Sequence, residues 1–311
     1  MFRSRLMMYG LALVLATTLL VRSGSGPAAP LSLRLATWNL EWLVDGNTAR
    51  AARIACRDGQ PSALPCDVAR ELSRDSADLA RLARYARELD ADVIAFQEVQ
   101  NTAIAQRVFR GYRICMNAGH GLQQVGFALR PGLAHDCGHA LTTLVVGDQG
   151  RAGLQLTISP PGSGDIELLA VHLKSGCARE PVESASEACV LLAAQARALG
   201  QWIAAHASSN SRFIVLGDFN RGGPPDIADQ FWSWLGPRNF QSSDNTLPFR
   251  NCAWGAPYRE FIDHILVSQN LVNSLAADPF HQLRYRPADA ARYRLSDHCP
   301  VGVSLNARPA L

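Results

Sequence analysis

Residues 212–222 read RFIVLGDFNRG, and this stretch joins a buried strand to polar residues at its end. Phe213–Leu216 is a short apolar run of the β-branched and aromatic types that favour strands. Asp218 and Asn220 lie just beyond it. Successive side chains of a strand point to opposite faces, so we expect Asp218 to face a cleft while the run behind it joins the core.

Other segments share this feature of polar residues at or just beyond the end of an apolar run. Each segment alone is weak evidence, because a lone Asp-His pair or a strand-end Glu is usually a cap or a turn residue. Together, and in this order, they indicate one shared site. They are ATWNLEWL (36–43), DVIAFQEVQ (92–100), LLAVHLKSG (168–176), EFIDHILVS (260–268) and RLSDHCPV (294–301).

Strand-like runs and helical patterns alternate along the chain, which predicts a layered α/β domain of two sheets flanked by helices. No long linker interrupts residues 31–307, so we expect a single domain. Residues 44–75 carry Gly, Pro and two cysteines and predict a long loop with a poor helix. The expected helices are 76–89, 184–205 and 227–235. The expected strands are 33–39, 92–98, 112–116, 125–129, 141–146, 154–158, 167–173, 213–218, 261–267 and 300–305.

The composition excludes a disordered chain and gives no support to nucleic-acid binding through bulk charge. The 311 residues are 48% hydrophobic and 18% charged, enough to bury a sizeable core. The formal charge is +3, but Arg3, Arg5 and Arg22 lie in residues 1–26, which contain no acid. The remainder balances 27 basic against 27 acidic residues.

The first 26 residues have the layout of a secretory signal. Two arginines precede an uncharged, mostly apolar run over 6–21, and small residues and proline follow. The run is shorter than the roughly 18 residues of a membrane span. We expect cleavage between residues 23 and 29 and a periplasmic or secreted protein, with a short uncleaved anchor as the alternative.

Eight cysteines, an even number, predict disulfides in an exported protein. Eight cysteines allow 105 connectivities, so the sequence does not decide the pairing. Buried free thiols and a metal site are the alternatives, although no C-x-x-C pattern is present. Nearest-neighbour pairing is our hypothesis: Cys56–Cys66, Cys115–Cys137, Cys177–Cys189 and Cys252–Cys299.

The ordered set of motifs resembles the endonuclease/exonuclease/phosphatase superfamily, the DNase I-like proteins, over residues 33–305. The most specific motifs are GDFN (217–220), SDH (296–298) and WN (38–39), with QE (97–98) and VHLKS (171–175) in support. The resemblance implies a four-layer α/β sandwich, in which helices flank two packed mixed β-sheets and the active site lies at one edge. It also implies a divalent-cation-dependent phosphoesterase.

The resemblance assigns Glu98 as the principal metal ligand, with Asn39 supporting the metal or orienting Glu98. Asp297 would complete the metal shell or orient its neighbour. Glu41 lies two residues after Asn39, on the same strand face, and would serve a second metal position or be a structural acid with an arginine partner. Oxygen donors of this kind suit Mg²⁺ or Mn²⁺, with Ca²⁺ as an alternative.

The same resemblance implies the catalytic roles. His298 would contact the scissile phosphate, and Asp263 would hold one nitrogen of its ring. Asp218 would activate water or protonate the leaving group, Asn220 would bind a phosphate oxygen, and His172 would bind phosphate or act as an acid. Which of Asp218, His172 and His298 is the base stays open. The alternative for His172 and Asp263 is a buried hydrogen-bonded pair.

Lys174 is the single lysine among 30 cationic residues. A compact ammonium differs from a guanidinium in hydration and reach, and Lys174 lies two residues after His172. We therefore expect it to line the cleft and to contact phosphate or an active-site carboxylate. His264 should point away from the site because its neighbour Asp263 points into it. His135 and His139 should lie in a surface loop, together with His120.

These observations favour an exported, divalent-metal-dependent phosphodiesterase, foremost a nuclease that hydrolyses DNA or RNA. A phosphatase or a sphingomyelinase-like lipid phosphodiesterase on the same scaffold is the first alternative. A catalytically silent binding module is the second, against which the full set of polar residues argues. We expect a monomer with a nucleic acid or other phosphodiester substrate and no stable protein partner.

Overall fold

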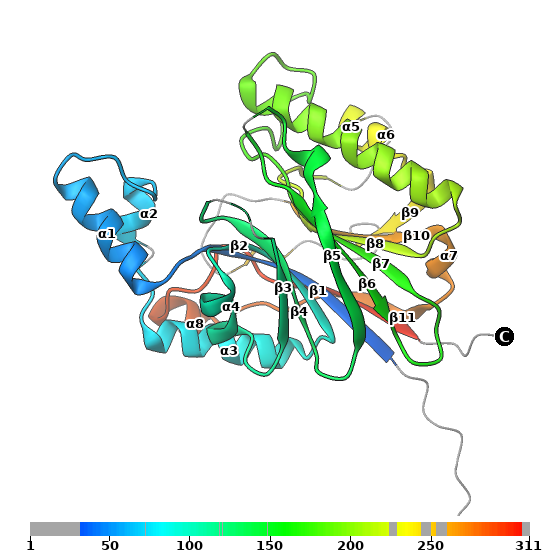
Figure 1. Cartoon of the computed structure of the whole chain (residues 1–311), viewed down its shortest axis with the longest axis horizontal. Coiled ribbons are helices and arrows are strands. Elements are labelled where there is room, and N and C mark those ends of the chain that lie inside the picture. Colours follow the sequence, from blue (N-terminus) through cyan, green and yellow to red (C-terminus); the bar gives the residue numbers. More distant parts are fainter. Residues whose placement is uncertain are drawn as a thin grey trace, which may run out of the picture.

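The computed structural model describes residues 32–306 apart from 72, 118, 120, 148, 224–228, 244–249 and 253–259. The predicted signal segment, His120 and the first residues of the helix expected at 227–235 lie outside the described residues. The rest forms two six-stranded sheets, packed face to face, with helices on both outer sides (Figure 1). This arrangement confirms the four-layer α/β sandwich.

The first sheet has the strand order β11-β12-β1-β2-β4-β3. β1 runs parallel to β2 and antiparallel to β12. The strands are β1 (Ser32–Leu43), β2 (Val93–Val99), β3 (Arg113–Met116), β4 (Gln124–Leu129), β11 (Leu275–Gln282) and β12 (Val301–Asn306).

The second sheet has the order β5-β6-β7-β8-β10-β9, and β7 runs parallel to β8. Apolar side chains from the facing strands, such as Leu35, Phe127 and Leu216, form the core between the two sheets. The strands are β5 (Ala134–Leu141), β6 (Gly153–Ser159), β7 (Ile166–His172), β8 (Phe213–Asp218), β9 (Phe240–Ser242) and β10 (Asp263–Ser268).

Helices cover the outer faces of both sheets. α3 (Ser76–Leu89), α4 (Thr102–Val108) and α8 (Pro287–Arg292) cover the first sheet, and α5 (Glu187–Ser208) and α6 (Gln230–Leu235) cover the second (Figure 1). α5 is long and apolar enough to cross a membrane, but half of it is buried against the second sheet. It is therefore a core helix. The remaining helical turns are α7 (Gln269–Val272), η1 (Thr142–Leu144) and η2 (Pro237–Asn239).

The prediction of a strand at 141–146 is wrong. Residues 142–144 form η1, and the strand is β5, which includes His135 and His139. Most side chains of this edge strand are exposed, so its sequence has no buried apolar face to indicate a strand. β9 and β11 were also missed, because β9 has only three residues and Pro279 interrupts β11.

Residues 44–75 contain more helix than predicted. α1 (Gly46–Arg57) and α2 (Cys66–Glu71) form an arm that lies apart from the sandwich (Figure 1). Asp45 begins α1 by accepting hydrogen bonds from the amides of Asn47 and Thr48. The small side chains that hold the helices together carry little hydrophobic signal, which is why the sequence resembled a loop. They form a cluster of Val44, Ala49, Ala52, Leu64 and Ala69.

All four predicted disulfides are present. The Cα–Cα distances of the pairs are 5.1–5.6 Å, and no cysteine is free. Cys56–Cys66 joins the two arm helices, Cys115–Cys137 joins β3 to β5, and Cys177–Cys189 anchors the start of α5. Cys252–Cys299 lies beside the motif SDH.

The arm should depend on the Cys56–Cys66 bridge, because its own apolar cluster is small. Replacing both cysteines with serine should lower the local free energy of unfolding of the arm by about 2–3 kcal/mol. Amide hydrogen exchange should accelerate in α1 and remain unchanged in β8, which serves as the internal control. Equal protection of α1 with and without the bridge would show that the helix packing suffices.

Candidate active site

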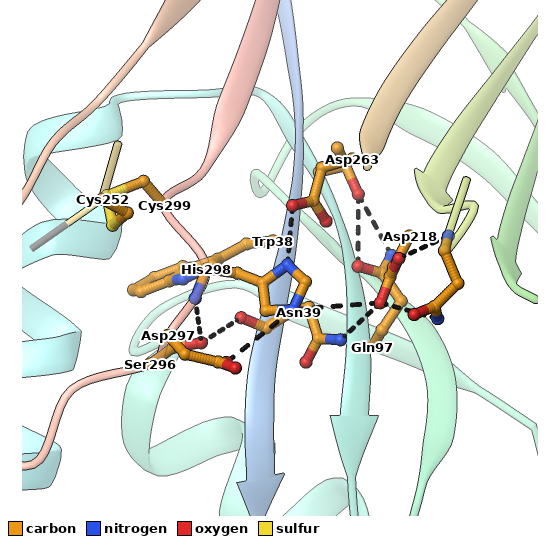
Figure 2. A network of polar contacts seen from close by, with 12 residues as sticks. Trp38, Asn39, Gln97, Asp218, Cys252, Asp263, Ser296, Asp297, His298 and Cys299 are labelled. Atoms are coloured by element: carbon orange, nitrogen blue, oxygen red, sulfur yellow. Dashed lines mark hydrogen bonds and ion pairs between the residues drawn. A yellow bond between two sulfur atoms is a disulfide. The ribbon is translucent and has the colours of Figure 1, made fainter. Parts of the chain in front are cut away.

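Strand pairing brings the predicted residues to one end of the sandwich. In the second sheet, Asp218 is the register partner of His172 on one side and of Asp263 on the other. In the first sheet, Asn39 pairs with Gln97, directly before Glu98. The polar ends of the two sheets meet there, as Figure 2 shows for Asn39, Asp218, Asp263 and His298.

Asn39 connects the two sheets. Its Nδ2 donates to Glu98 Oε1 at 3.1 Å and to Asp218 Oδ2 at 2.9 Å. Its Oδ1 accepts the backbone N–H of Glu41 at 2.9 Å. The backbone N–H of Trp42 donates to Glu98 Oε2 at 3.0 Å. Asn39 therefore orients the two carboxylates and has its oxygen engaged.

Unusual backbone conformations concentrate at this site. Of the six non-glycine residues with positive φ in the described chain, four lie here, namely Glu41, Trp42, Glu98 and Asn220, with φ of 45–61°. The left-handed region is unfavourable for residues with a side chain and is tolerated where the surroundings impose it. The β1–β2 register also shifts between Asn39 and Leu43, so the chain bends where the carboxylates need backbone donors.

His298 is held by Asp263, as predicted. Its Nδ1 lies 2.6 Å from Asp263 Oδ2, and its Nε2 faces Asp297 Oδ1 at 3.7 Å and Asp218 Oδ2 at 3.9 Å. Burial alone would lower the pKa of His298, but the carboxylates of Asp263, Asp297 and Asp218 outweigh it and raise the pKa well above its usual value. These carboxylates therefore favour the protonated form of the ring.

The surroundings of His172 favour its neutral form instead. Its Nε2 lies 3.5 Å from Glu98 Oε1 and 3.6 Å from Asp218 Oδ2. Burial, helped by the charges of Arg151 and His298, lowers its pKa well below the usual value. The buried-pair alternative for His172 and Asp263 does not hold, because Asp263 contacts His298.

Asp218 titrates near neutral pH. Burial raises its pKa to about 7, with repulsion from Asp263 adding to it, while His298 and the hydrogen bonds from Asn220 and Asn39 oppose the shift. The Asn220 backbone N–H donates to Asp218 Oδ1 at 2.8 Å, and its Nδ2 donates to Asp218 Oδ2 and to the Leu173 carbonyl, each at 3.1 Å. The carboxyl can therefore exchange a proton under physiological conditions.

The SDH loop is fixed through its backbone. Ser296 Oγ donates to the Asn39 carbonyl at 2.7 Å and accepts the His298 N–H at 3.1 Å. The Tyr285 hydroxyl donates to the His298 carbonyl at 2.6 Å and accepts from Trp38 Nε1 at 2.8 Å. Sequence reasoning missed Tyr285, which lies in a segment with no recognisable motif.

Glu41 has an arginine partner, as in the structural alternative that the sequence left open, and a role at a second metal position stays a prediction. Its Oε2 accepts the Asp297 N–H at 3.0 Å and lies 3.6 Å from Arg74 Nη2. Burial first, and then Asp297, raise the pKa of Glu41 to about 7, while Arg74 lowers it. The left-handed turn at Glu41 and Trp42 interrupts the alternation of the strand, so Glu41 does not share the direction of Asn39 toward Glu98.

A structural role for Arg74 was not predicted from the sequence. Its side chain is 2% exposed and donates to three carbonyls, those of Glu41 at 2.7 Å, Leu295 at 2.6 Å and Arg294 at 3.0 Å. It therefore ties the end of β1 to the SDH loop. No local sequence pattern distinguishes it from the other arginines.

The carboxylates fit a hard divalent cation. Asp297 Oδ1 is buried without a hydrogen-bond partner among the described residues. Burial raises the pKa of Asp297, repulsion from Glu98 and Asp263 adds to the shift, and His298 opposes it. Glu98, His172 and Asp218 each place a ligand atom within 4.8 Å of the others. Crowded carboxylates with an unsatisfied oxygen are typical of a site completed by a cation.

In the described part of the chain no ion pair joins Lys174 to a carboxylate, which is one of its two alternative predicted contacts. β7 ends at His172, so the alternation does not continue to Lys174, whose Nζ donates to the Ser175 carbonyl at 3.1 Å. A contact with phosphate stays a prediction. The cation beside the carboxylates is instead Arg151, which donates to the Leu173 carbonyl and the Gln123 side chain and acts electrostatically on Glu98 and Asp218.

His264 points away from the site, as expected. Its Nε2 lies 2.8 Å from the Arg221 carbonyl, and its ring packs between Phe219 and Trp232.

Comparisons with known proteins agree with this geometry. The model of the Endonuclease/Exonuclease/phosphatase family matches residues 36–298. The chain belongs to this family. No curated protein matches the chain.

Solved structures of members with this fold extend the comparison. Truncated TDP2 from Caenorhabditis elegans superposes with a TM-score of 0.59 at 15% identity, covering 89% of this chain and 98% of that chain. D. rerio TDP2 in complex with a single-strand DNA product gives 0.58 at 20%, covering 88% and 99%. The 3'-5' exonuclease NExo from Neisseria meningitidis gives 0.57 at 16%, covering 88% and 100%. Because the sequence identities are this low, these comparisons show a shared fold only.

Proposed function

We propose that this family member is a divalent-metal-dependent phosphodiesterase that hydrolyses nucleic-acid phosphodiester bonds outside the cytoplasm. One observation carries the proposal: His298, whose pKa is raised, His172, whose pKa is lowered, and the Asp218 carboxyl, whose pKa is about 7, converge beside Glu98 and Asp297. This set provides cation ligands, a charged donor and a group able to move a proton.

Each residue has a proposed role in hydrolysis that follows from its charge. Glu98 and Asp297 would hold Mg²⁺ or Mn²⁺, which supplies charge neutralisation at the phosphate when bound. His298 donates its Nε2 proton toward a phosphate oxygen, and Asp263 keeps its ring in place. Asp218 takes a proton from the attacking water, because its pKa lies near the working pH. His172 and Arg151 position the phosphate from the second sheet.

Nucleic acid is the proposed substrate because solved structures with this fold include a DNA-bound TDP2 and an exonuclease. Export is proposed from the signal-like residues 1–26, and four disulfides suit an oxidising compartment. A monomer is proposed, and its mass in solution would test this.

Chelation should abolish hydrolysis. Purified mature protein in EDTA should lose at least about 100-fold of its activity on a single-stranded oligonucleotide, because Glu98, Asp297 and Asp218 repel the phosphate without a cation. Mg²⁺ should restore the activity and raise the melting temperature. Glu98→Gln should show neither response and is the matched control.

Two outcomes would contradict the proposal in different ways. Nuclease activity that persists in EDTA would refute the metal assignment. Metal-dependent hydrolysis of sphingomyelin or a phosphate monoester, with no cleavage of DNA or RNA, would keep the metal site and refute the substrate.

A further inference from the structure

A cleft of about 690 Å³ lies beside the catalytic residues. Its lining includes Trp42 and Ala63 on the side of the arm, Asn117, Leu122 and Gln123 of the β3–β4 connection, and Arg151. The arm therefore shapes this cleft.

The cleft is continuous with the site through two residues. Trp42 lines the cleft, and its backbone N–H donates to Glu98 Oε2 at 3.0 Å. Arg151 lines it too, and its charge acts on Glu98 and Asp218. A substrate whose phosphate lies at Glu98 therefore places the group next to that phosphate in the cleft.

Among the described residues, the lining contains one tryptophan and one charged side chain. Trp42 and Leu122 are partly buried against the apolar cluster of the arm. Asn117 Nδ2 donates to the carbonyls of Ala152 at 2.9 Å and Gly153 at 3.3 Å, while its Oδ1 is buried with no partner among the described residues. Arg151 is the one charged residue among the described residues that line the cleft.

These features favour a nucleobase over an acyl chain or a run of phosphates as the occupant of the cleft. A nucleobase offers a π-face to an indole and polar edges to the amide side chains of the lining. An acyl chain would lie against the polar side chains of Gln123, Gln124 and Arg151, at a cost in free energy. A run of further phosphates would need more cations than Arg151 alone.

We propose that this cleft is a nucleobase subsite, in which the indole of Trp42 stacks on the base adjoining the scissile phosphate. The inference rests on the proposed nuclease function and deepens it. A base in a duplex is already stacked and paired, so the subsite selects single-stranded segments.

The test is an abasic scan of a short single-stranded oligonucleotide. A tetrahydrofuran residue replaces one nucleoside at a time on either side of the cleaved bond, which removes the base and keeps the backbone. For the wild-type protein, removal at one position should lower kcat/KM by about 5- to 100-fold. In Trp42→Ala the same removal should have no effect, and Trp42→Phe should retain most of the dependence.

The ratio of intact to abasic substrate separates stacking from any disturbance of Glu98, because a displaced Glu98 slows both substrates equally. Trp234→Ala is the matched control, since Trp234 is a partly buried tryptophan on α6 with the Arg197 guanidinium 3.9 Å from its ring centroid. It should leave the ratio unchanged.

Normal cleavage by the wild-type protein, with the same base dependence in Trp42→Ala, would overturn the subsite and leave the nuclease function standing. Cleavage of a short-chain phospholipid but of no oligonucleotide, with Trp42→Ala altering the preference for acyl length, would overturn both.

Discussion

His298→Ala should slow hydrolysis by about 10²- to 10⁴-fold while the fold remains intact. The substitution removes the protonated ring that contacts Asp263 at 2.6 Å and faces Asp218 and Asp297 with Nε2. It also leaves three carboxylates without the charge that offsets their mutual repulsion. Steady-state kinetics with saturating Mg²⁺ measures the loss, and circular dichroism checks the fold.

Asp263→Asn provides the graded comparison. An amide can hold the ring but cannot stabilise its charge, so we expect a loss of about 10- to 100-fold. The double variant should be little slower than His298→Ala alone, because the two residues act as one unit. His206→Ala is the matched control, since His206 pairs with Glu167 at 3.1 Å outside the site. Equal losses in the control and in His298→Ala would refute a catalytic role for His298.

Arg74→Ala should destabilise the protein by about 3–5 kcal/mol. The substitution leaves the carboxyl of Glu41 without its cation and removes the donor of three carbonyls, among them that of Leu295. Urea unfolding measures the change. Because Glu41 also holds the Asp297 N–H, we expect weaker Mg²⁺ binding in the folded fraction, measured by calorimetry.

Two further variants separate charge from packing. Arg74→Ala combined with Glu41→Gln should recover part of the stability, because the unpaired acid is no longer present. Arg84→Ala, at an exposed position of α3, is the control and should change stability by less than about 0.5 kcal/mol. An Arg74→Ala protein as stable as Arg84→Ala would show that the hydrogen bonds to the SDH loop contribute nothing.

The central strands were predictable because their signal is local. β8 matches the range expected from RFIVLGDFNRG, and α3 matches 76–89, where apolar residues recur at helical spacing. The edge strands β5, β9 and β11 could not be predicted, because an edge strand is partly exposed and needs no continuous apolar face.

The sequence by itself determined which residues could form the site. Asn39, Glu98, Asp218 and His298 each adjoin an apolar run, and a strand carries the polar residue at its end wherever the run is buried. The nearest-neighbour hypothesis for the disulfides is confirmed, although the sequence alone did not decide the pairing. These inferences succeed because the interacting positions are close in sequence or share one regular element.

Only the tertiary structure decided the supporting contacts. Arg74 lies 33 positions from Glu41 and 221 from Leu295 along the chain, and Arg151, just before β6, acts electrostatically on Glu98 and Asp218. The contact of Glu41 with Arg74 lies where two left-handed residues turn the strand, which the sequence did not indicate. Such contacts depend on how distant segments pack, and a single arginine in a chain with 29 of them carries no local signal of its partner.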